Sequence, residues 1–164
     1  MNQRASQLQE TANGQISELI GLISTRGEAA LRLPCPGREK LGDGTVAACA
    51  MHTADNYHRI AAFLQGPRGG GHTRIAKLLH RHREDQHKDN YQADNIDLPA
   101  LLDRLSTGGA ALNVLADLTD AQLDAVPPAS EMKFCDGQRT LQQIITNMLN
   151  HQNHQLDALT TAIA

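Results

Sequence analysis

Hydrophobic residues recur at intervals of three and four along most of the chain, which is the period of an amphipathic α-helix. The pattern predicts four long helices: residues 6–26, from residue 43 or 45 to about 65, 97–118, and from 140 towards the C-terminus. No segment alternates polar and apolar positions as a β-strand does. We therefore predict an all-α fold, a four-helix bundle with one long connection between its second and third helices.

Capping signals support these boundaries. Asp97 has the character of an N-cap for the third helix, and Thr119 and Thr140 each begin a capping box. The third helix contains Gly108 and Gly109, and each glycine costs roughly 1 kcal/mol relative to alanine inside a helix. We therefore expect a kink or break at these two glycines.

The connection between the second and third helices forms an insert at about 66–96, within a single domain spanning 1–164. It opens with a glycine-rich run, and its sequence predicts a short basic helix over 73–84. We interpret it as a solvated, mobile segment, with a lid over a substrate as the alternative. His80 and His82 in this insert are two residues apart, so they do not converge on a helix and are not predicted to bind a metal.

Composition excludes several classes of partner. The 164 residues carry a net charge of −3 and no tryptophan, which argues against nucleic acid as a partner. No apolar run approaches the roughly 20 residues that span a bilayer, and the polar N-terminus lacks the apolar stretch of a signal peptide. Three cysteines are an odd number for a disulfide framework. We expect free thiols, a cytoplasmic location, no membrane and no nucleic acid.

Two helices carry potential metal donors at helical spacing. Cys49 and His52 are three residues apart on the second helix, and His151 and His154 are three apart on the last. Residues at this spacing share a helix face, and bundles build metal sites from facing helices. The alternatives are that Cys49 is a buried apolar residue and that the histidines of the last helix are solvated.

Cys135 precedes the final helix, so we expect the helix dipole to stabilise its thiolate and make it the reactive thiol. Thiolate ligands would favour zinc or copper(I) over magnesium. Zinc is the first expectation among divalent transition metals, with nickel and copper as alternatives. Cys35 lies in a loop between two prolines and is equally well read as a structural cysteine.

The stretch 46–54 with His52 and the stretch 149–155 with His151 and His154 resemble the DinB-like superfamily, also called the YfiT-like or mycothiol-dependent maleylpyruvate isomerase-like group. The resemblance covers the helix order of most of the chain. It implies a four-helix bundle, often dimeric, that holds a divalent metal with one ligand on the second helix and two on the last. In some members the metal activates a low-molecular-weight thiol. His52 matches the second-helix ligand and His151 the first ligand of the last helix.

This sequence differs from the family pattern at the third ligand position. The family spaces its last two ligands four apart, which places Gln155 where a histidine is expected. A shift of three residues makes His154 the final ligand but puts Asn150 at the preceding position. A softer set restores the donor count: His52, His151 and His154, completed by Cys49 or Cys135.

The leading hypothesis is a metal-binding protein that acts on a small molecule or thiol as a transferase, isomerase or hydrolase, with Asp55 or His58 as proton carrier. The alternative is a non-catalytic soft-metal or thiol sensor or sequestration protein. Its donors would be the three thiols of Cys35, Cys49 and Cys135. A third hypothesis is a metal-free helical scaffold that forms a homodimer.

Overall fold

The computed structural model describes residues 2–65 and 91–164, and this part of the chain is helical and contains no β-strand. The prediction of an all-α fold is confirmed. The elements in chain order are α1 (Gln3–Arg26), η1 (Glu28–Arg32), α2 (Val46–Gln65), η3 (Ala93–Asn95), α4 (Leu98–Ala111), η4 (Leu112–Asp117), α5 (Asp120–Asp124) and α6 (Leu141–Ile163), where η marks a 3₁₀ helix. The predicted basic helix over 73–84 and most of the insert lie outside the described residues.

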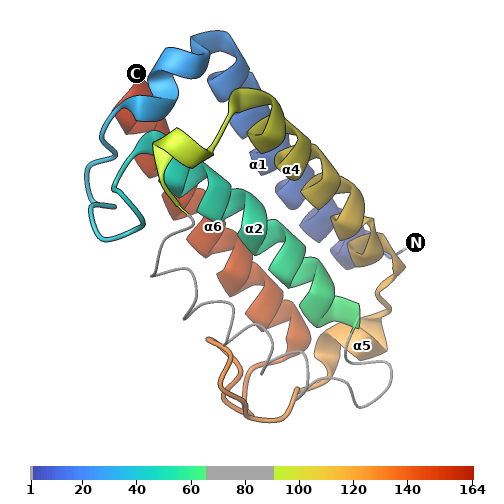
Figure 1. Cartoon of the computed structure of the whole chain (residues 1–164). Coiled ribbons are helices and arrows are strands. Elements are labelled where there is room, and N and C mark those ends of the chain that lie inside the picture. The colour runs from blue at the N-terminus through green and yellow to red at the C-terminus, as the bar shows by residue number, and fades with distance from the viewer. Residues whose placement is uncertain (1, 66–90) are drawn as a thin grey trace.

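α1, α2, α4 and α6 lie side by side around a common core (Figure 1). α1 and α2 each pack against both α4 and α6. The inward faces are almost entirely aliphatic, and Leu19, Leu105 and Ile144 are fully buried. Tyr57 at the centre of the core donates its hydroxyl to Gln15 Oε1 at 2.8 Å, and Gln15 in turn donates to the Leu149 carbonyl at 3.0 Å. These two bonds satisfy buried polar groups of three helices and tie α1, α2 and α6 together.

The predicted caps at Asp97, Thr119 and Thr140 are confirmed, whereas α1 begins at Gln3, three residues before its predicted start, and is capped by Asn2. Asp97 accepts from the Ala100 N–H at 2.7 Å and begins α4. Thr119 and Thr140 form complete capping boxes with Gln122 and Gln143, which begin α5 and α6. Each box satisfies N–H groups that the first helical turn leaves without a backbone partner.

The third helix differs from its prediction, because α4 continues as α-helix past both glycines and ends at Ala111. The chain then continues as the 3₁₀ helix η4 instead of as α-helix to residue 118. A β-carbon on Gly108 would lie 3.3 Å from Cβ of Tyr57. The glycine therefore allows a close approach of α4 to α2, which explains why it is placed inside a helix.

The loop over residues 33–45, between η1 and α2, is hydrogen-bonded to the segment that leads into η3. Asp43 N donates to the Tyr91 carbonyl at 2.9 Å, and Ala93 N donates to Asp43 Oδ2 at 2.8 Å. Gly42 has a φ of 57°, and a β-carbon there would lie 2.0 Å from the backbone carbonyl oxygen of Tyr91. Only glycine fits this contact. The loop is thereby positioned along one end of α2.

Candidate functional site

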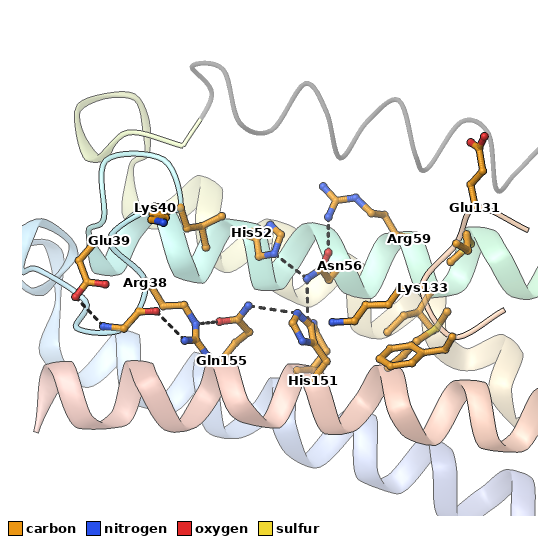
Figure 2. A pocket seen from close by; sticks show the side chains of 17 residues that line it. Arg38, Glu39, Lys40, His52, Asn56, Arg59, Glu131, Lys133, His151 and Gln155 are labelled. Carbon is orange, nitrogen blue, oxygen red and sulfur yellow. Dashed lines mark hydrogen bonds between the residues drawn. The ribbon is translucent and has the colours of Figure 1, made fainter. Parts of the chain in front are cut away.

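A cavity of about 640 Å³ lies between α2 and α6, within the size range of small-molecule sites. Figure 2 shows Arg38, Glu39 and Lys40 of the 33–45 loop at one end and Glu131 and Lys133 at the other. The side chains of α2 and α6 line its length. The lining residues are Gly37, Arg38, Glu39, Lys40, Leu41, His52, Asn56, Arg59, Ile60, Glu131, Met132, Lys133, Phe134, Met148, His151, Gln152 and Gln155.

His52 faces the cavity from α2, and its orientation is set by an amide. Asn56 Nδ2 lies 3.2 Å from His52 Nε2 and donates to Gln152 Oε1 at 3.1 Å. Arg59 donates to Asn56 Oδ1. A guanidinium group can only donate, so the Asn56 oxygen must face Arg59 and its N–H₂ group must face His52. His52 Nε2 is therefore the acceptor in this bond.

His151 faces the same cavity from α6 and has the same arrangement. Gln155 Nε2 lies 3.5 Å from His151 Nε2, while Gln155 Oε1 accepts from Arg38 and from the Cys49 thiol at 3.6 Å. Each helix thus presents an imidazole and an amide four residues later (Figure 2). The Asn56 amide is oriented by Arg59 of α2 itself, and the Gln155 amide by Arg38 of the 33–45 loop. The neutral imidazole is the form that accepts such a bond.

The other predicted ligands lie elsewhere. His154 is exposed on the outer face of α6 and does not line the cavity. Cys49 is fully buried behind Gln155. Cys135 is buried six residues before the start of α6, and it does not line the cavity either.

The described residues do not fit a metal centre with three protein ligands. Across residues 2–65 and 91–164, no three side chains of His, Cys, Asp or Glu gather closely enough to hold a metal ion. Gln155 stands four residues after His151, where the family resemblance led us to expect a third ligand, and the Nε2 atoms of His52 and His151 face amide N–H groups. A neutral amide is a weak ligand for zinc, which prefers imidazole, thiolate and carboxylate. Metal binding through His52 and His151 stays a prediction.

The prediction that Cys135 is a reactive thiol is wrong. Its side chain is only 4% exposed, and burial raises the pKa of its thiol above the ordinary value. The chain between Cys135 and Leu141 separates the thiol from the N–H groups of α6, so the helix dipole does not offset desolvation there.

The three cysteines do not form one cluster. Cys35 and Cys49 are neighbours: each thiol affects the pKa of the other, and both lie near Arg38. Neither of them affects the pKa of Cys135, whose neighbours are Ser130 and Asp136. A soft-metal site built from all three thiols is therefore absent from the described structure.

Asp55 and His58, the suggested proton carriers, are not among the residues that line the cavity. Asp55 accepts from Arg104 Nε at 2.8 Å and from the Tyr91 hydroxyl, and it pairs with Arg59 at 3.9 Å. His58 Nε2 lies 3.0 Å from the Arg104 carbonyl. Their contacts serve to join α2 to α4 and to Tyr91.

The functional residues missed by sequence reasoning are the two arginines that orient the amides. Arg59 is 9% exposed, and burial lowers the pKa of its guanidinium. Its spacing of four from Asp55 signals an ion pair on one helix face. Arg38 gave no such signal, because its partner Gln155 is 117 residues away.

The chain was compared with protein-family models, with curated proteins and with solved structures, and it matches none of them. None of the helices in the described ranges is long and apolar enough to cross a bilayer.

Proposed function

We propose that this chain is a DinB-like four-helix bundle, with its long connection between α2 and α4, that binds a small organic molecule in the cavity between α2 and α6. The observation that carries the proposal is the pair of imidazoles, His52 and His151, which line one cavity and are each oriented by an amide. Polar groups held in place in a cavity that also has apolar surface are characteristic of ligand sites. Imidazoles there can accept a hydrogen bond or a proton from the ligand.

Three free cysteines favour a reducing compartment, so a cytoplasmic location is part of the proposal. On the basis of the resemblance to DinB-like proteins, we also propose that the chain forms a homodimer. The same resemblance adds a low-molecular-weight thiol as one possible class of bound molecule.

The test is ¹⁵N nuclear magnetic resonance of the protein titrated with the neutral apolar probe N-phenyl-1-naphthylamine. We expect shifts concentrated in α2, α6 and the 33–45 loop, because these segments form the cavity wall. The ring nitrogen signals of His52 and His151 should shift, while those of His154 on the exposed face of α6 stay in place. Shifts scattered over the outer surface of α1, or no binding at all, would contradict a ligand cavity here.

A second candidate function is binding of a divalent metal ion through His52 and His151, and it is favoured because both imidazoles line the same cavity. With only two imidazoles in the described lining, the ion would keep open coordination positions. We expect His52→Ala and His151→Ala to lose most zinc or nickel bound by the purified protein. His154→Ala, a matched change on the exposed face of the same helix, should retain it.

Because imidazole must be neutral to bind a metal, affinity should also fall as the pH drops through about 6.5. Atomic emission analysis of metal per chain after dialysis measures both effects. Full zinc occupancy in His52→Ala would show that the ion binds outside this cavity.

A further inference from the structure

We propose that the cavity between α2 and α6 selects an organic anion, whose carboxylate or sulfonate group pairs with Arg38 while its apolar body lies towards Phe134. This inference rests on the proposed function, since it names the class of molecule that the same cavity takes.

The charge of the lining favours an anion. Four basic residues line the cavity, Arg38, Lys40, Arg59 and Lys133, against two carboxylates, Glu39 and Glu131. The excess of positive charge lies along a partly enclosed surface, where electrostatic attraction is screened less than in open water. Arg59 already pairs with Asp55. The remaining lining has three cations against two carboxylates, an excess of one positive charge that an anionic ligand would compensate.

Arg38 is the best placed of these cations. It is half-buried, its Nε donates to Gln155 and its Nη1 donates to the Gly37 carbonyl at 2.9 Å. Both acceptors are neutral, and they use two of the five N–H groups of the guanidinium. Nowhere in 2–65 and 91–164 does a carboxylate come within ion-pair distance of Arg38. Arg59, by contrast, is already paired with Asp55.

Arg38 is also held rigidly enough to act as a binding group. Its partner Gln155 is only 4% exposed and is fixed by further contacts with Cys49 and His151. A guanidinium that is already oriented loses less entropy when it binds a planar acid group. Gln155 contacts both Arg38 and His151. A molecule whose acid group pairs with Arg38 and whose body extends along the cavity would therefore lie beside the His151 imidazole.

The opposite end of the cavity provides apolar surface for the body of the ligand. Met132, Phe134 and Met148 line it there, with Ile60 from α2. Phe134 is half-buried and has a positive φ of 76°, a conformation that non-glycine residues adopt at a cost of about 1–3 kcal/mol and that is concentrated at ligand sites. Methionine side chains adapt to ligands of different shape.

The test compares two fluorescent probes with related aromatic rings: the anionic 8-anilinonaphthalene-1-sulfonate and the neutral N-phenyl-1-naphthylamine. Arg38→Gln is expected to weaken binding of the sulfonate about 10- to 100-fold, the effect of losing one charged hydrogen-bonded pair. Binding of the neutral probe should stay within about twofold of wild type. Arg38→Lys should restore part of the sulfonate affinity. Arg26→Gln, the same change at an exposed position of α1, should alter neither probe.

A salt titration of the wild-type chain needs no variant and therefore avoids any folding defect of Arg38→Gln. Sodium chloride should weaken binding of the sulfonate but not of the neutral probe, because only the first depends on charge. Equal effects of Arg38→Gln and of salt on the two probes would overturn the assignment of Arg38, while the neutral probe would still report a ligand cavity. If the neutral probe fails to bind the wild-type cavity, the proposed function itself is overturned.

Discussion

Replacing Asp55 with alanine is expected to lower the free energy of unfolding by about 3–5 kcal/mol, the range found when one partner of a buried ion pair is removed. The Asp55 side chain is 14% exposed and that of Arg59 is 10% exposed. Asp55 also accepts from Arg104 and from Tyr91. Without the carboxylate, the buried guanidinium of Arg59 would lose its ion pair with Asp55, while its contacts with the Tyr91 hydroxyl and the Asn56 amide would remain.

Urea unfolding followed by circular dichroism measures this loss, with Asp94→Ala as the matched control. Asp94 pairs with Arg32 at 2.5 Å, but both side chains are more than half exposed. An exposed pair contributes about 0–1 kcal/mol, so Asp94→Ala should change stability little. Similar small decreases in the free energy of unfolding of both variants would show that the ion pairs of Asp55 are solvated and stabilise the fold no more than an exposed pair does.

A double variant separates the charge effect from the shape of the site. Asp55→Leu combined with Arg59→Met removes both charges together and should recover much of the stability lost by Asp55→Ala. The same variant loses the donor that orients Asn56. His52 should then lose its fixed partner, and the ring nitrogen signals of His52 should change even though the fold is retained.

The Cys49 thiol is expected to react roughly a thousandfold more slowly in the folded protein than in the unfolded chain at pH 8. Burial raises the pKa of Cys49 from 9.0 to about 12, and only the thiolate attacks an alkylating reagent. The difference between these two pKa values lowers the thiolate fraction by about three orders of magnitude. Full burial of the side chain also blocks access of the reagent.

Iodoacetamide labelling with mass-spectrometric mapping of each cysteine measures this protection, and guanidinium-unfolded protein gives the reference rate. Ser24→Cys places an additional thiol on an exposed position of α1 and should react at nearly the unfolded rate. Cys35 and Cys135 should also be protected, since burial raises the pKa of both. Native labelling of Cys49 within about tenfold of the unfolded rate would contradict its placement behind Gln155.

The same pKa difference predicts how stability depends on pH. An unfolded cysteine has the ordinary pKa of 9.0, whereas burial raises the pKa of Cys49 in the folded chain to about 12. The contribution of this group to the free energy of unfolding is therefore complete below about pH 9. It declines as the pH rises from there to the folded pKa of about 12. Buried Tyr57 and Tyr91, whose pKa values are also raised by burial, act in the same direction.

Much of the site could be anticipated from helical spacing alone. The apolar stripe of the last helix places His151 at its edge and Gln155 nearer its centre, and the structure finds His151 half-buried and Gln155 buried. His154, three residues after His151, lies further round the helix and is exposed. Side chains on one helix are related by a constant rotation per residue, so their relative directions follow from sequence positions.

Local sequence also determined where the main helices start. The Thr140 and Gln143 pair begins α6 and Asp97 begins α4, because a cap bonds to N–H groups only two or three residues away. The periodic spacing of apolar residues was sufficient to establish an all-α fold.

Tertiary structure alone decided which polar groups meet. Arg38 reaches Gln155 across 117 residues, and Asp55 meets Tyr91 from 36 residues away. The burial of Cys135, which reverses its expected reactivity, depends on how the segment before α6 folds over its neighbours. Local signals such as caps and periodicity act within one or two helical turns, whereas burial and long-range pairing exist only once the helices have packed. The sequence by itself therefore determined the helices and the directions of His52 and His151, and packing supplied the cavity and the arginines that orient its amides.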